Sequence, residues 1–372
     1  MKADMTTKGE GVPVAFTGRR GTGRQSVPAT ACFAVTRKIW LLIAAIAGLL
    51  VLSGLAISCG AYAVRLPDIL AVLDAHLIRG EDASAINPLF NTIVWKIRLP
   101  RVLLCITVGT ALASAGAIFQ GCFRNPLVEP YILGVSSGAA FGAAVGIVFP
   151  WLPVSVQVLA FTGGAVAVIC TCGMARVRGR IPTITLVLAG IVVGSVFSAL
   201  VGIMKYVAQD AALREIVFWL MGGFYYVTWD DVRLITPIIA GCFFLSWALG
   251  WKLNVLSMGD EEARSLGVNP EKIKLLLLTL ATLMTALAVS VVGIIAWVGL
   301  MIPHAARMTA GPDHRFVLPL ASLLGGGYLI VCDTLARTLT SAEIPVGIIT
   351  SIAGAPYLFF LIRAKGKTAF GA

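Results

Sequence analysis

The sequence predicts an all-α membrane protein that crosses the bilayer about ten times. Of its 372 residues 58% are apolar and only 13% are charged, and the apolar residues form long runs between short polar segments. Soluble domains are roughly 45–50% apolar and about 25% charged. A soluble protein of this length cannot bury so apolar a chain, so the excess must face lipid. The composition excludes a soluble enzyme, a disordered chain and a disulfide-stapled secreted domain.

The predicted spans follow from the apolar runs, since a helix needs about 20 residues to cross the hydrocarbon core. Ile273 to Met301 is too long for one crossing, and Gly293 is the natural break. The runs 131–149 and 294–310 are short and rich in Gly or Pro, so either could be re-entrant, and nine or eleven spans are the nearest alternatives. The ten spans are 39–61, 102–122, 131–149, 152–175, 183–204, 232–251, 273–292, 294–310, 316–336 and 346–363.

Basic residues orient this bundle in a cell membrane. Ten spans place both termini on one side, and that side holds 20 of the 29 Lys and Arg residues. Basic loops stay inside, so both termini are predicted to be cytoplasmic. The net charge of +11 is spread thinly between apolar runs, which indicates basic loops and no nucleic-acid partner. We expect residues 1–38 to form a disordered basic tail, 39–363 the membrane domain, and 364–372 a second cytoplasmic tail.

Neither a metal nor a cofactor is predicted to bind this chain. Its eight cysteines contain no C-x-x-C pair, and its three histidines (His76, His304 and His314) lack ligand spacing. Gly18 to Arg24 superficially resembles a phosphate loop, but it lacks the G-K-[ST] ending and no strand precedes it. We therefore expect no ATP site in this chain.

Small residues recur at four-residue intervals on two predicted spans. Lipid gives helices no hydrophobic reason to associate, so small residues mark places where backbones approach closely. We expect tight helix packing at these stripes, with direct substrate contact as the less favoured alternative. The stripes are Gly109, Ala113, Ala117 and Gly121 on one span, and Gly134, Gly138, Gly142 and Gly146 on the next.

Three arginines lie at the predicted outer ends of spans, where charged residues are costly and usually functional. Arg98 and Arg101 precede the second span, and Arg337 ends the ninth, one turn after Asp333. Position alone leaves two interpretations equally open. In the first, the arginine side chains extend to the membrane–water interface, and Asp333 and Arg337 pair on one helix. In the second, the arginines form a cationic rim that docks an acidic partner or substrate.

The predicted cytoplasmic segment 252–272 carries the capping signals of a short helix from Met258 to Leu266. Ser257 is expected to cap it, and Gly267 to end it in the left-handed conformation. Asn269-Pro270 then begins the next span. A rigid amphipathic helix here is typical of a docking element for a soluble partner. The alternative, a helix lying on lipid, is disfavoured by its three acids.

Several blocks of sequence together resemble the FecCD family, the permease subunits of type II ABC importers for iron-siderophores, haem and vitamin B12. The resemblance extends from about Leu41 to Arg363. One departure is Ala296-Trp297, where the family often has Gly-Phe. The blocks are IRLPR at 97–101, RNPLVEP at 124–130 after Gln120, ILGVSSG at 132–138, WLMGG at 219–223, LSMGDEEARSLG at 256–267, VGLMIPH at 298–304, GPDHR at 311–315, EIPVG at 343–347 and GAP at 354–356.

The resemblance implies the type II ABC importer permease fold and a set of partners. These are a second permease subunit (a homodimer, sometimes a heterodimer), two cytoplasmic ATPase subunits that hold ATP and Mg, and an extracytoplasmic binding protein. It favours docking of the binding protein by Arg98, Arg101 and Arg337, and it places the cytoplasmic gate at Thr183 and Ile184. The coupling helix that meets the ATPase would comprise Ser257, Met258, Gly259, Asp260, Glu261, Glu262, Ala263, Arg264, Leu266 and Gly267.

The predicted function is import of a metal chelate by alternating access. An iron-siderophore is the favoured cargo, and haem and cobalamin are the next candidates. The alternative is a secondary transporter driven by an ion gradient. Such a transporter would carry intramembrane acids, and only Glu129 and Asp333 are candidates, both near span ends. A channel would need a ring-forming filter motif, which the sequence lacks.

Overall fold

The computed structural model describes residues 29–60, 62–79, 87–176, 182–340 and 342–369. Contacts divide the chain into two units, 1–37 and 38–372. Residues 1–28 of the predicted tail lie outside the described residues, but the chain is already helical at Ala29, where α1 (Ala29–Ser58) begins. Ala, Phe and Val in residues 29–35 extend the apolar helix ahead of the predicted span. Everything below concerns the second unit.

Each of the ten predicted spans coincides with a helix, and the described residues contain no strand, which confirms the all-α fold. Seven helices are long and apolar enough to cross a membrane, while α5 and residues Val346–Phe360 of α15 are shorter apolar helices. The helix α15 continues to Ala369, through most of the predicted C-terminal tail. Besides α1 the helices are α4 (Leu99–Phe123), α5 (Val135–Val148), α6 (Val156–Ala175), α7 (Thr183–Val207), α9 (Trp229–Ala248), α12 (Pro270–Val292), α13 (Val298–Ala310), α14 (His314–Ala336) and α15 (Val346–Ala369).

Short helices that the sequence did not predict fill the segments between spans. The amphipathic α8 is the longest of them, and α10 and α11 together replace the single short helix expected at Met258–Leu266. These elements are α2 (Leu66–Asp74), η1 (Ala75–Arg79), α3 (Pro88–Asn91), η3 (Thr92–Arg98), η4 (Pro130–Leu133), α8 (Asp210–Met221), α10 (Gly250–Met258) and α11 (Asp260–Ser265).

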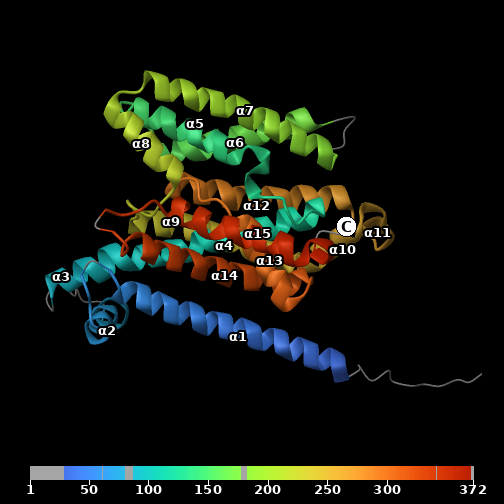
Figure 1. Ribbon diagram of the computed structural model, residues 1–372, viewed down its shortest axis with the longest axis horizontal. Coiled ribbons are helices and arrows are strands. Elements are labelled where there is room, and N and C mark those ends of the chain that lie inside the picture. The colour runs from blue at the N-terminus through green and yellow to red at the C-terminus, as the bar shows by residue number, and fades with distance from the viewer. Residues whose placement is uncertain (1–28, 61, 80–86, 177–181, 341, 370–372) are drawn as a thin grey trace, which may run out of the picture. The chain divides into compact units, whose positions relative to one another are not determined.

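The helix α4 lies at the centre of one packed group. In its most apolar window 83% of the residues are buried, against 11% for α1. Its neighbours are α9, α12, α13 and α14. A second group contains α5, α6, α7 and α8, and α12 packs against both groups (Figure 1). A helix that is apolar all round is either enclosed by other helices, as α4 is, or faces lipid, as α1 can.

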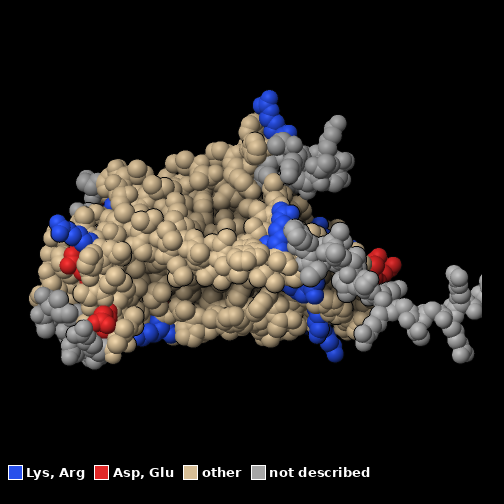
Figure 2. Space-filling model, turned by 90° about the horizontal axis from the view of Figure 1, so that it is seen from below, with Lys and Arg blue, Asp and Glu red and all other residues tan. Residues whose placement is uncertain are grey.

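Charged side chains gather at the two ends of the helices. On the face shown in Figure 2, Lys, Arg, Asp and Glu lie toward the ends of the long axis, and the band between them is almost free of charge. Large apolar side chains remain exposed on the apolar helices, such as Leu50 (67%) on α1 and Ile191 (58%) on α7. Such a surface suits lipid and not water, so the protein is a multi-pass membrane protein. We call the end where α4 begins the arginine end, and the end where α4 finishes the α11 end.

Candidate functional site

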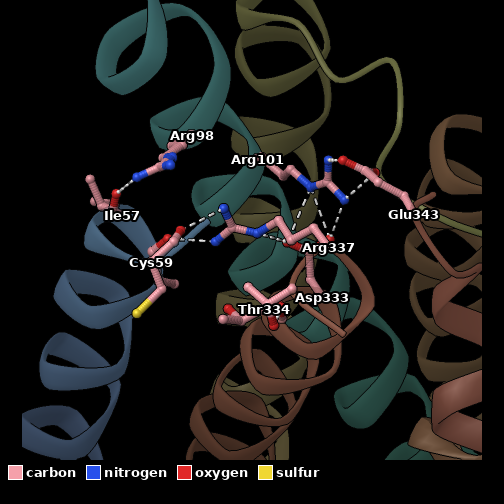
Figure 3. Close-up of polar contacts among 10 residues, drawn as sticks. Ile57, Cys59, Arg98, Arg101, Asp333, Thr334, Arg337 and Glu343 are labelled. Atoms are coloured by element: carbon pink, nitrogen blue, oxygen red, sulfur yellow. Dashed lines mark hydrogen bonds and ion pairs between the residues drawn. The ribbon is translucent and has the colours of Figure 1, made fainter. Parts of the chain in front are cut away.

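The three arginines of the predicted docking rim lie together where α1 ends, α4 begins and α14 ends (Figure 3). They do not form an exposed rim. Arg98 is 5% exposed and Arg101 6%, and the Arg337 side chain is 9% exposed. Each guanidinium group is bound to backbone carbonyls or carboxylates of the chain. The docking role itself stays a prediction.

Arg98 and Arg337 bind the C-terminal end of α1. Arg98 Nη1 donates to the carbonyls of Ile57 at 2.6 Å and Ser58 at 2.9 Å, and Arg337 donates to those of Ala56 at 2.5 Å and Cys59 at 3.0 Å. The last four carbonyls of a helix have no partner within the helix, and the negative end of its dipole attracts cations. These two arginines therefore stabilise the end of the first span.

Arg101 bridges two carboxylates from different parts of the chain. Its Nε donates to Asp333 Oδ1 at 2.9 Å, and its Nη1 and Nη2 donate to Glu343 Oε1 and Oε2 at 3.1 and 2.9 Å. Asp333 is 2% exposed and also forms the predicted ion pair with Arg337, whose Nε lies 3.4 Å from Asp333 Oδ2. All three guanidinium nitrogens of Arg101 are thus engaged, in the bidentate geometry that makes such pairs strong. Sequence patterns assigned no role to Glu343, although this residue opens the EIPVG block.

The start of the predicted coupling helix differs from expectation. Ser257 lies in the last turn of α10, and its hydroxyl donates to the Leu253 carbonyl at 2.8 Å, so it does not cap the next helix. Gly259 separates α10 from α11 with φ 152°, and a Cβ there would collide with the Glu262 carboxylate. Ser257 and Met258 therefore belong to α10, and the short helix begins at Asp260. Because α10 continues to Met258, the Ser257 hydroxyl is bonded within that helix.

The end of this segment agrees with the prediction. Gly267 has φ 76°, and Val268 N–H donates to the Ala263 carbonyl at 2.9 Å, as in a left-handed helix ending. The Asn269 side chain caps α12, and Pro270 is its first residue. Ala263 is buried while Met258 (64%) and Leu266 (53%) are exposed. The helix α11 is therefore fixed to the bundle on one side and presents apolar and acidic side chains on the other.

The predicted gate residues stand at the beginning of α7. Thr183 is its first residue, and Ile184 is 75% exposed. Residues 177–181, just before them, lie outside the described residues. No contact in the described part of the chain covers Ile184, so the gate stays a prediction.

The small-residue stripes pack helices together, although not all on one face. A Cβ on Gly109 would meet the backbone of Gly325 in α14, and Cβ atoms on Gly138 and Gly142 would meet the backbone of α6. Gly134 differs because it precedes α5 with φ 78° and lies against α7. At Gly146 the nearest atom, Leu159 Cδ1, would be 3.0 Å away. Ala113 and Ala117 are fully buried.

A second close contact joins Gly116 of α4 to Gly299 of α13, where a Cβ would strike the Gly299 carbonyl. The four-residue pattern of small residues did not predict this contact, since Gly116 lies one residue before Ala117 of that pattern. Trp297, the departure noted above, adopts a left-handed φ of 74°, and its N–H donates to Glu129 Oε1 at 2.8 Å. Burial raises the pKa of Glu129, and the hydrogen bond from Trp297 opposes that rise.

The described residues contain no group of three or more His, Cys, Asp or Glu side chains placed to hold a metal. What the chain offers instead is two opposite surfaces. The arginine end holds a buried cluster of cations and carboxylates, and the α11 end holds a rigid exposed helix.

Comparison with known proteins decides the family. The FecCD transport family model matches residues 46–364. The chain belongs to the FecCD transport family. This family consists of ABC transporter permease subunits, which lack an ATPase site of their own and work with ATPase and binding-protein partners.

Individual relatives agree with this assignment. The FecCD chain is 43% identical over 276 residues to the cobalamin import system permease protein BtuC of Halobacterium salinarum, covering 74% of each chain. It is 43% identical over 286 residues to the hemin transport system permease protein HmuU of Yersinia pestis, covering 75% of this chain and 85% of that one. A solved metal-chelate type ABC transporter in an inward-facing conformation matches with TM-score 0.76 and 33% identity, covering 87% of this chain and 98% of the other.

Proposed function

We propose that this chain is the membrane-spanning subunit of an ATP-driven importer, which carries a metal chelate from an extracytoplasmic binding protein to the cytoplasm by alternating access. The family match over residues 46–364 is the observation that supports this most directly. The chain would form a homodimer with the pathway between its subunits. Both termini and α11 would face the cytoplasm, and the arginine end would face outward.

The proposed power source is a pair of ATPase subunits that hold ATP and Mg and bind at α11. The helix has the features that such a contact needs. At its start, Asp260 Oδ1 accepts a hydrogen bond from Lys274 Nζ of α12 at 2.6 Å, and at its end the left-handed Gly267 leads directly into α12. A displacement of α11 would therefore be transmitted to α12. Met258 and Leu266 offer apolar contacts, and Glu261 and Glu262 offer charges.

The proposed dock for the binding protein is the arginine end, where carboxylates of the partner would meet Arg98, Arg101 and Arg337. Since Arg101 is fully engaged, an incoming carboxylate must displace one of its partners. Glu343 is the one that can leave, because its side chain is 39% exposed while that of Asp333 is 2% exposed. Charge pairs of this kind set orientation and association rate more than net affinity.

The proposed cargo is an iron-siderophore, with haem and cobalamin as the next candidates. Relatives named for iron complexes include the probable iron chelatin permeases of two Helicobacter pylori strains, at 37% identity, and a ferric citrate permease of Bacillus subtilis, at 36%. The relatives named for cobalamin and hemin are 43% identical to this chain, which keeps both as candidates. The test is uptake of labelled iron-siderophore, hemin and cobalamin by cells that lack the permease and carry it on a plasmid. Restored uptake of the siderophore alone supports the proposal, and restored uptake of none contradicts it.

The alternative function, transport driven by an ion gradient, has little support in the geometry. A coupling acid must exchange its proton or ion, which marks it as free or water-accessible. Asp333 is buried and paired with two arginines, and Glu129 is bound to the Trp297 amide. Uptake that persists when the partner ATPase is inactivated would favour this alternative.

A further inference from the structure

An open groove with a volume of about 570 Å³ lies at the α11 end. The end of α4, the end of α10 and the turn between α13 and α14 form its walls. Nothing in the proposed function above uses it. The side chains that matter for its chemistry are Arg124, Asn254, Met258, Arg307, Asp313 and His314.

Two cations in this groove have no carboxylate partner among the described residues. Arg124 is exposed just after α4, with φ 53°, and Arg307 is half-buried on α13. The side-chain contact of Arg307 is with the neutral Gln120 Oε1. Neither arginine takes part in the ion pairs of the described chain. A partly buried charge without a counter-ion is costly, so an anion from outside the chain would stabilise it.

The single acid of the groove cannot fill this role, because it is already engaged. Asp313 accepts from Arg315 Nη2 at 2.7 Å and from Asn254 Nδ2 at 2.7 Å. Burial raises the pKa of Asp313, but these hydrogen bonds bring it well below its usual value, so the carboxylate is ionised and satisfied. Arg124 and Arg307 are therefore left without a carboxylate partner in the described part of the chain.

A buried histidine in the wall also has an unused polar atom. His314 is 5% exposed, and its Nδ1 lies 2.8 Å from Asn254 Oδ1. That contact assigns the Nδ1 proton, since Asn254 Nδ2 already donates to Asp313. His314 Nε2 has no hydrogen-bond partner in the described part of the chain. With its proton on Nδ1, the ring presents Nε2 as a hydrogen-bond acceptor, so the groups of the groove that can attract an anion are the two arginines.

We propose that this groove receives an acidic side chain of the ATPase subunit, beside the contact made by α11. The inference rests on the proposed function and adds a second attachment point to it. Met258 at the rim is 64% exposed, and Arg and Met are residues enriched at protein interfaces. The contact would tie the ATPase to α4 and α13 as well as to α11.

The first test is a titration of the permease, in neutral-lipid nanodiscs, with the ATPase subunit purified from its native complex. We expect R124E to weaken binding about tenfold or more, in line with loss of a close charge pair, and to flatten the salt dependence. The matched control is R176E, a charge reversal at an exposed arginine after α6 that does not line the groove. Equal binding by R124E and wild type would overturn the inference. Absence of binding by the wild type would instead overturn the proposed function.

The second test identifies the chemical group in the groove. R124K places an amine there, and a zero-length carbodiimide crosslink should join it to an Asp or Glu of the ATPase subunit, read out by mass spectrometry of the linked peptides. An intact complex without that crosslink would contradict the proposal. A defect of R124E that appears only in nanodiscs containing phosphatidylglycerol would assign the groove to lipid and would also contradict it.

Discussion

At the scale of single residues, the cluster around Arg101 matters most because its charges are buried. Asp333 is 2% exposed; it depends on Arg101 for its hydrogen bonds and on both Arg101 and Arg337 for counter-charge. Breaking a buried pair by removing one partner costs about 3–5 kcal/mol, whereas an exposed pair is worth roughly 0–1 kcal/mol. The cluster therefore contributes to folding whether or not it docks a partner.

We expect R101A to lower the thermal stability of the purified protein strongly, on the order of 3–5 kcal/mol, because it leaves Asp333 with one partner. The control is R233A, whose ion pair with Asp230 joins side chains that are 75% and 93% exposed, and which should change stability by less than about 1 kcal/mol. Thermal unfolding in detergent measures both variants. Equal melting temperatures for the two would show that the Arg101 cluster does not stabilise the fold.

A second prediction concerns Glu343 as the carboxylate that an incoming partner displaces. E343Q removes the charge that competes for Arg101 while keeping a side chain of the same shape. We expect loaded binding protein to bind E343Q more tightly than wild type, by up to about tenfold, since a hydrogen bond to a neutral amide is weaker than one to a carboxylate. Surface plasmon resonance on nanodisc-embedded permease measures this. Weaker binding by E343Q would mean that Glu343 positions Arg101 for docking.

These residues also show what a sequence can and cannot predict at this scale. The Asp333–Arg337 pair follows from four-residue spacing on a helix, and the structure contains it. The Arg101–Glu343 pair joins residues 242 positions apart, and no local pattern indicates it. The inward orientation of Arg98 likewise depends on where α1 ends beside it.

At the scale of helices, close glycine contacts hold the bundle together, and they can be tested individually. G142A would place a methyl against the Leu159 carbonyl of α6, so we expect a loss of about 1–3 kcal/mol, as for overpacking. G202A on α7 is the control, because nothing lies within 4 Å of its added Cβ, and it should be neutral or slightly stabilising. Thermal unfolding of both variants measures the difference, and no difference would contradict glycine-dependent packing.

The start of α11 gives a fourth prediction. G259A combines an unfavourable φ of 152° with a clash against the Glu262 carboxylate, so it should shift the beginning of the helix. If α11 transmits force from the ATPase, the variant will assemble and hydrolyse ATP but will import less cargo for each ATP consumed. The ratio of uptake to hydrolysis measures this coupling. A wild-type ratio in G259A would contradict the coupling role of α11.

Sequence patterns predicted the end of α11 better than its start. Gly267 and the Asn269-Pro270 pair act locally, and their conformations are as expected. The start depends on how far α10 extends, which the packing of α10 on α4 and α14 decides. The amphipathic α8 was missed for a related reason, since its 12 residues are too few and too polar to be recognised as a span.

At the scale of the whole molecule, the physics of lipid made the fold predictable. A bilayer admits few structures, so long apolar runs translate directly into helices, and all ten predicted spans coincide with one. The band of Figure 2 that is almost free of charge reflects the same constraint, because charged side chains are costly where the surface faces lipid. Composition cannot predict the partners, since a permease and a secondary transporter face the same lipid. The family match supplies that distinction.

The most direct test of the whole account is uptake of a labelled iron-siderophore into proteoliposomes that contain the permease and its ATPase subunits, with the loaded binding protein outside and ATP inside. We predict uptake that needs all three proteins and ATP, and that is unaffected by collapsing proton and sodium gradients. Uptake by the permease alone, driven by an imposed gradient, would contradict the account.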